Sequence, residues 1–137
     1  MEFLDAAQKM IAIDSSPAFG TVEVVRFIKN LAEQMGFQAD VYEESGNGIA
    51  QANILIKPNG NPQKLLLQTH LDTTDPGSFA LWTKTGLNPY QPSIRGDKIY
   101  GLGAADVKLD FLCKLYANNR PILISNYFNI VNSHFLH

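Results

Sequence analysis

The stretch of sequence that decides the fold is Leu65-Leu66-Leu67-Gln68-Thr69-His70-Leu71-Asp72. Its three leucines are continuously apolar rather than alternating, which predicts a strand that is covered on both faces and central in its sheet. Residues i and i+2 of an extended segment point to the same side, so His70 and Asp72 are expected to project together from the end of this strand. The carboxyl ends of strands are where open α/β sheets place their ligand sites.

The elements around this strand follow from periodicity and turn residues. Apolar residues at helical spacing predict a helix over the first dozen residues and a second helix over residues 21–35. Strands are predicted at Gln38–Glu43, Ala52–Lys57, Lys64–Thr69 and Lys98–Tyr100, and a last helix is predicted at Val107–Asn118. This order indicates an α/β fold, a layered sheet with helices on both faces.

Composition narrows the possible functions. The 137 residues include 11 basic and 13 acidic side chains, and a formal charge of −2 gives no electrostatic footprint for nucleic acid or for an anionic membrane. The single cysteine, Cys113, cannot form an internal disulfide, which fits a reducing compartment. No apolar run is long enough to span a bilayer, and acidic residues stand where a signal peptide carries bases. We therefore expect a soluble, cytoplasmic protein.

The end of the chain differs in composition from the rest. Residues 121–137 contain no Lys, Arg, Asp or Glu, although charge is spread over the preceding chain. One interpretation is a core strand with its loop, and the other is an altered or truncated terminus, which we favour slightly. We accordingly divide the chain into a domain at 1–117 and an atypical tail at 118–137.

The candidate site residues have ordinary structural explanations when each is taken alone. His70 beside Asp72 suits a zinc ligand whose other ring nitrogen is oriented by a carboxylate, but a structural His–Asp pair is more frequent. Asp106 follows the turn Gly101-Leu102-Gly103 and precedes a helix, so its carboxylate either caps that helix or bridges two cations. Lys108 is expected to be a surface or helix-start charge.

Taken together and in order, these motifs resemble the M20 metallopeptidase family. The resemblance covers roughly residues 1–117 and includes the two leading helices. It rests on the first motif His70-Leu71-Asp72, on Trp82, on Gly86-Leu87-Asn88-Pro89-Tyr90-Gln91-Pro92, and on Gly96-Asp97-Lys98-Ile99-Tyr100-Gly101-Leu102-Gly103-Ala104-Ala105-Asp106-Val107-Lys108. It implies the N-terminal portion of a zinc-peptidase-like catalytic domain.

The resemblance also implies roles for three residues. His70 corresponds to a ligand of one of two zinc ions, Asp72 to the catalytic-site aspartate, and Asp106 to the carboxylate that bridges both metals. Enzymes of this kind, which can also work with cobalt, hydrolyse the amide bond of an N-acyl amino acid or a peptide, and acetylornithine is our best single guess. The family forms homodimers through a lid domain that has no counterpart in this chain.

Departures from the family pattern leave the expected site incomplete. No Glu or Asp follows Asp110, so the general base and the later ligands of the family have no match, and His134 and His137 lie in the unmatched tail. Leu102 replaces the usual arginine, and Leu109-Asp110 replaces small residues. We therefore expect an incomplete amidohydrolase with little activity. The alternative is a non-catalytic α/β binding or assembly module with a vestigial metal site.

Overall fold

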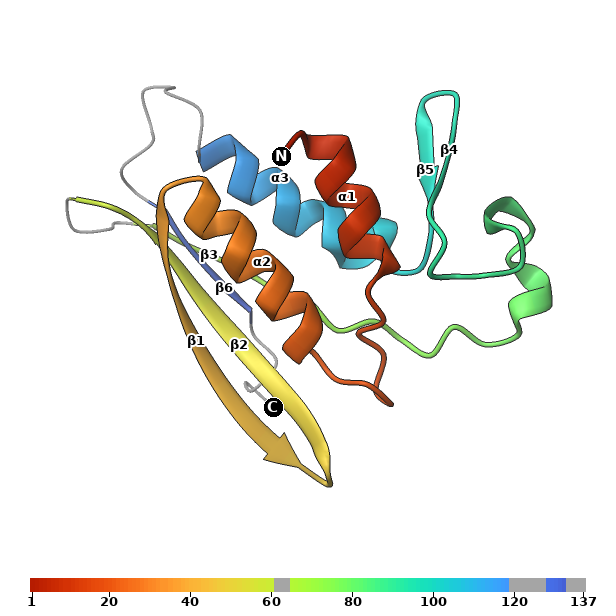
Figure 1. Cartoon of the computed structure of the whole chain (residues 1–137), viewed down its shortest axis with the longest axis horizontal. Helices are drawn as coiled ribbons and strands as arrows, with labels where there is room; N and C mark the ends of the chain where they lie inside the picture. The colour runs from red at the N-terminus through yellow and green to blue at the C-terminus, as the bar shows by residue number, and fades with distance from the viewer. Residues whose placement is uncertain (61–64, 119–127, 133–137) are drawn as a thin grey trace.

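The computed structural model describes residues 1–60, 65–118 and 128–132. Three α-helices lie on one side of a four-stranded sheet, and a separate two-stranded hairpin stands beyond the helices (Figure 1). This arrangement confirms the α/β class predicted from the sequence. The expected helices on both faces are not seen, because the helices of the described residues all pack on one face.

The helices form where the apolar spacing predicted them. Helix α1 spans Phe3–Ala12, α2 spans Val22–Gln34 and α3 spans Leu109–Asn118. The chain leaves α2 through Gly36, whose φ of +87° is left-handed and favours glycine. All three helices contribute buried side chains to one core, which includes Met10, Ile28 and Phe111.

The first two strands form a long antiparallel hairpin. Strand β1 spans Phe37–Gly46 and β2 spans Ile49–Pro58, so both are longer than predicted. Asn47 and Gly48 connect them with φ values of +53° and +78°, the two positive values that a type I′ turn requires. Alternate residues of β2, namely Ala52, Ile54 and Ile56, are buried against the helices.

The strand that precedes His70 is not central, contrary to the prediction. The strand order is β1-β2-β6-β3, which places β3, Leu65–Thr69, at the edge of the described sheet. Leu67 packs against the core, but the side chain of Leu66 points to the other face and is 55% exposed. The prediction of a strand covered on both faces was therefore wrong for the described residues, because the described helices cover only one face of β3.

The neighbour of β3 comes from the atypical tail. Strand β6, Phe128–Asn132, pairs in parallel with β3 and antiparallel with β2. We had favoured an altered or truncated terminus slightly over a strand with its loop. For these five residues the structure instead agrees with a strand of the sheet. Residues 119–127 and 133–137, which include His134 and His137, lie outside the described residues.

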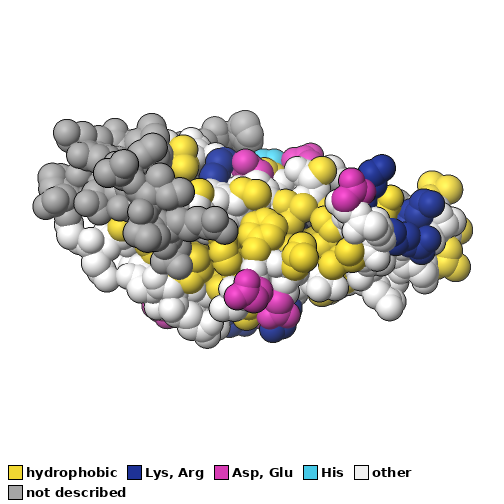
Figure 2. All heavy atoms as spheres, turned by 90° about the horizontal axis from the view of Figure 1, so that it is seen from above, with side chains coloured by type: hydrophobic (Ala, Val, Ile, Leu, Met, Phe, Trp, Pro, Cys, Tyr) yellow, Lys and Arg dark blue, Asp and Glu magenta, His cyan; other side chains and the backbone are white. Residues whose placement is uncertain are grey.

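The segment between β3 and α3 is irregular, as its prolines and glycines predicted. Two short 3-10 turns, Phe79–Leu81 and Thr83–Thr85, precede a hairpin of β4, Ser93–Arg95, with β5, Lys98–Tyr100. Seen from the side of α1 and α3, acidic and basic side chains are interspersed around a central hydrophobic area (Figure 2). Within the described ranges, no helix combines the length and the hydrophobicity needed to cross a membrane.

Candidate metal centre

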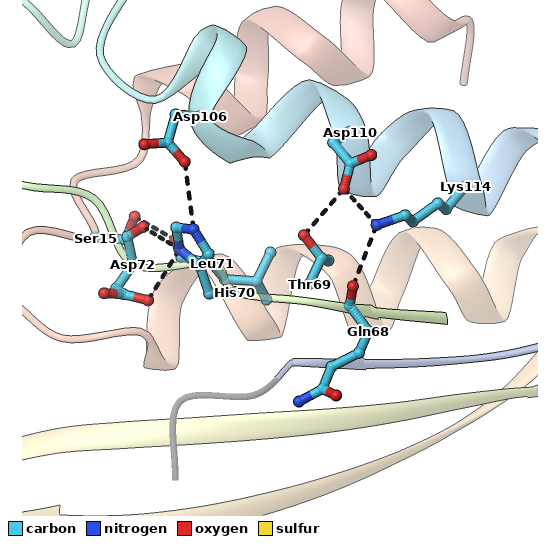
Figure 3. Close-up of polar contacts among 9 residues, drawn as sticks. All are labelled: Ser15, Gln68, Thr69, His70, Leu71, Asp72, Asp106, Asp110 and Lys114. Atoms are coloured by element: carbon cyan, nitrogen blue, oxygen red, sulfur yellow. Dashed lines mark hydrogen bonds and ion pairs between the residues drawn. The ribbon is translucent and has the colours of Figure 1, made fainter. Parts of the chain in front are cut away.

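His70 lies between two carboxylates just beyond the end of β3 (Figure 3). Its Nδ1 is 3.1 Å from the main-chain carbonyl oxygen of Asp72 and 3.3 Å from the carboxylate of the same residue. Its Nε2 is 3.3 Å from Oδ1 of Asp106. The structure thus brings together all three residues that the sequence singled out.

Asp106 reaches this place from an irregular helical turn. The turn, Ala104–Lys108, precedes α3 and contains Asp106 at non-helical φ and ψ angles of −123° and 89°. The side chain of Asp106 is 84% exposed, and among the described residues its carboxylate has no hydrogen bond that would cap a helix. Its recorded contact is with His70. The helix-cap explanation of Asp106 is therefore not supported.

Both ring nitrogens of His70 face hydrogen-bond acceptors, and this arrangement limits how the imidazole ring can be protonated. A neutral imidazole carries one N–H, so it can donate to Asp72 or to Asp106 but not to both. The remaining nitrogen would direct its lone pair at a carboxylate unless a second proton or a cation lies between them. A cation between Nε2 and Asp106 satisfies both groups.

The spacing of these two atoms agrees with that possibility. Nitrogen and oxygen ligands lie about 2.0 to 2.2 Å from zinc, so two of them on a tetrahedral ion are about 3.3 to 3.6 Å apart. The observed 3.3 Å between Nε2 of His70 and Oδ1 of Asp106 falls at the short end of this range. Asp72 faces the other nitrogen, where it can orient the ring but cannot share the same ion.

The ligand set is nevertheless partial. A catalytic zinc site uses three protein ligands, and the described parts of the chain contain no group of three His, Cys, Asp or Glu side chains placed to hold one ion. His70 and Asp106 therefore fit a metal as a pair of ligands, and further ligands would be needed to complete its coordination.

The end of β3 is held by helix α3. Asp110 accepts a hydrogen bond from the hydroxyl of Thr69 at 3.1 Å and forms an ion pair with Lys114 (Figure 3). Lys114 in turn donates to the main-chain carbonyl of Gln68 at 3.2 Å. Asp110, a departure from the family pattern, thus anchors the strand that carries His70, a role that its sequence position did not reveal.

Lys108 was predicted to be a surface or helix-start charge, and it lies directly before α3 but not on the surface. Its side chain is 1% exposed, and its ammonium group donates to the carbonyl of Ile13 at 2.6 Å. Burial lowers the pKa of Lys108 to about 8, while the negative charge of Asp14 acts in the opposite direction. Ile13, its hydrogen-bond partner, lies 95 positions earlier in the chain, so the local sequence gave no signal of this contact.

The three site residues line a single pocket of about 450 Å³. Its other walls come from Pro17, Thr73, Thr74 and residues 101–105. Thr73 has a buried hydroxyl oxygen for which no hydrogen-bond partner is found among the described residues. The pocket thus combines the His70–Asp106 pair with a concave surface that can admit a small ligand.

Comparisons with known proteins find relatives in sequence and in fold, although no protein-family model matches the chain. An uncharacterized metallohydrolase of Methanocaldococcus jannaschii is 43% identical over 60 residues, which are 43% of this chain and 14% of that protein. An acetylornithine deacetylase of Aliivibrio fischeri is 32% identical over 113 residues, covering 78% of this chain and 28% of the relative. The chain therefore spans only a minor part of the length of these curated relatives.

Solved structures share the fold. An M20 family metallo-carboxypeptidase from Sulfolobus solfataricus superposes with a TM-score of 0.75 at 24% identity, over 96% of this chain and 30% of that protein. Human carnosine dipeptidase 1 gives a TM-score of 0.64 at 17% identity, over 95% of this chain and 31% of that protein. In the segment that it shares with these proteins, the chain thus resembles metallohydrolases and deacylases in sequence, and it has the fold of an M20 family metallo-carboxypeptidase.

Proposed function

We propose that this chain carries part of the metal site of an amidohydrolase that cleaves the amide bond of an N-acyl amino acid. The observation that carries the proposal is the convergence of His70 and Asp106 to 3.3 Å, with Asp72 on the opposite side of the imidazole ring. Relatives named acetylornithine deacetylase and succinyl-diaminopimelate desuccinylase support this reaction class. N-acetylornithine remains our best single substrate.

The proposed roles follow from the direction of each contact. Asp72 accepts a hydrogen bond from Nδ1–H of His70, which fixes the tautomer of the ring and leaves the Nε2 lone pair free to bind a metal. Asp106 supplies a carboxylate oxygen beside that nitrogen. These residues would hold a divalent ion, for which we propose zinc with cobalt as a substitute, and such an ion would supply the Lewis acidity that polarises an amide carbonyl.

We further propose that the chain as given has little activity. The ligand pair is not completed by a third ligand among the described residues, and no acidic residue follows Asp110 to act as general base. The same observation favours a second candidate, a non-catalytic α/β binding or assembly module with a vestigial metal site. We propose a cytoplasmic location, and a homodimer only for a form that includes the family's lid domain.

Zinc calorimetry on the purified chain tests the proposal. We expect binding that is lost in His70→Ala and in Asp106→Ala, and that weakens by about 10- to 100-fold in Asp72→Asn, because that change removes an orienting partner. Glu43→Ala is the matched control, since it removes an exposed carboxylate on β1, away from the site. An absence of zinc binding by the unmodified chain would contradict the metal site.

A hydrolysis assay separates the two candidate functions. The unmodified chain loaded with zinc or cobalt is mixed with N-acetylornithine, and release of acetate is followed against a metal-free sample. Hydrolysis that depends on both the metal and His70 would support the amidohydrolase and exclude a purely non-catalytic module. Zinc binding without any hydrolysis would favour the vestigial site instead.

A further inference from the structure

Lys108 is the buried charged group that the proposed reaction does not use. Its side chain is almost fully enclosed, and its ammonium group has one recorded partner, the carbonyl oxygen of Ile13. Among the described residues no carboxylate lies within ion-pair distance of it. A charge that is buried in this way costs free energy, and an apolar side chain of similar volume would pack at lower cost. Packing alone therefore does not account for a lysine here.

Ile13, whose carbonyl accepts the hydrogen bond from Lys108, begins the loop between α1 and α2. This loop is hydrogen-bonded to the segment that contains Asp72. The hydroxyl of Ser15 donates to the carbonyl of Leu71 at 2.8 Å. The amide of Thr73 donates to the carbonyl of Ser15 at 3.0 Å. The two bonds hold the chain on either side of Asp72, and Ser15 is fully buried while it makes them.

Lys108 itself belongs to the turn that carries Asp106. Its amide donates to the carbonyl of Gly103 at 2.9 Å, which closes that turn. Gly103 in turn packs closely on Thr73, because a Cβ added to this glycine would lie 2.6 Å from the methyl group of Thr73. Contacts thus run from the Asp106 turn through Lys108 and Ser15 to the segment of Asp72.

We propose that Lys108 is a positioning residue that holds the Asp106 turn and the His70–Asp72 segment in register through the loop at Ser15. This inference rests on the proposed metal site, because its consequence is the alignment of the two carboxylates with opposite nitrogens of His70. Ligands must be held to within about half an ångström for such a site to work, and supporting hydrogen bonds provide that precision.

The test compares two variants of this connection with a matched control. Lys108→Met removes the ammonium group and keeps an unbranched apolar side chain, and Ser15→Ala removes the bond to Leu71. Thr21→Val is the control, because Thr21 is also fully buried and its hydroxyl bonds to the backbone of Ala52 on β2, away from His70. Urea unfolding confirms which variants are folded and how far each is destabilised.

The first readout is the pair of ring-nitrogen NMR signals of His70 in the metal-free protein, assigned with His70→Gln. We expect both test variants to shift these signals and Thr21→Val to leave them unchanged. This readout does not depend on metal binding, so it judges the inference even if the unmodified chain binds no metal. If Lys108→Met does not fold, Ser15→Ala decides.

The second readout is cobalt(II) binding followed by its visible absorption bands. We expect the dissociation constant to rise about 10- to 100-fold in the test variants, with altered band intensity, and to stay within about twofold in Thr21→Val. Unchanged His70 signals and unchanged cobalt spectra in folded test variants would overturn the proposal. Equal changes in the control would also overturn it, because they would mark a general loss of stability.

Discussion

Replacing Gly103 by alanine should destabilise the protein for two separable reasons. Gly103 has a φ of +73°, in the left-handed region where an L side chain costs about 1 to 2 kcal/mol. The new Cβ would also lie 2.6 Å from Cγ2 of Thr73, and overpacking of this kind costs about 1 to 3 kcal/mol. We therefore expect Gly103→Ala to lower the free energy of unfolding by about 2 to 5 kcal/mol.

A second substitution separates the two contributions. Thr73→Ser removes Cγ2 and keeps the hydroxyl, at a cost of about 1 kcal/mol for the lost buried methyl group. In that background Gly103→Ala should cost only its backbone strain and the milder contacts with Lys108 at 3.3 and 3.4 Å. The double-mutant cycle should therefore show a favourable coupling of at least about 1 kcal/mol.

Urea denaturation followed by circular dichroism measures all four proteins of the cycle. Gly86→Ala serves as the control for strain, because Gly86 has a φ of +65° and no atom within 4 Å of an added Cβ. It should cost about 1 to 2 kcal/mol, with no steric contribution. Additive effects of Gly103→Ala and Thr73→Ser, within about 0.5 kcal/mol, would refute the close contact between these segments.

Two further predictions concern the pH dependence of stability and the core. Burial and a hydrogen bond with Asp14 raise the pKa of Tyr90 to about 12, so its stabilising contribution is complete below pH 10 and lost as the pH rises through 12. Urea titrations at pH 9 to 11 should therefore show a smaller alkaline loss of stability in Tyr90→Phe, and an unchanged slope would contradict this. Phe111→Ala should lower the free energy of unfolding by about 3 to 5 kcal/mol in thermal or urea unfolding, because Phe111 is fully buried. Tyr42→Ala, at an exposed position, should change it by no more than about 0.5 kcal/mol. Similar losses in both variants would refute the assignment of the core.

The predictions that depended on local sequence agree with the structure. Each of the first two helices has an apolar stripe made only of its own residues, so the local sequence is enough to predict it. The observed bounds of these helices differ from the predicted ones by only a residue or two. The turn at Asn47 and Gly48 likewise needs only the conformational tolerance of these two residues. Local physics was sufficient at these places.

The predictions that depended on neighbours from distant parts of the chain were less successful. The three leucines of β3 indicated a central strand, but β6 from the tail takes the inner position and β3 lies at the edge of the described sheet. Lys108 was predicted to be a surface or helix-start charge, but its side chain is buried and its ammonium group contacts the carbonyl of Ile13, a residue far away in the sequence. Asp110 and Ser15 gave no local signal of the hydrogen bonds that support β3 and Asp72.

For the site, the sequence by itself determined that His70 and Asp72 share one side of the chain, since i and i+2 residues of an extended segment must do so. The resemblance to the M20 family then implied Asp106 as their partner. Only the tertiary structure decided that Asp106 faces Nε2 of His70 at 3.3 Å while Asp72 faces Nδ1. That geometry depends on how β3, the loop at Ser15 and the turn before α3 pack together, and such packing is set by long-range contacts that no local pattern encodes.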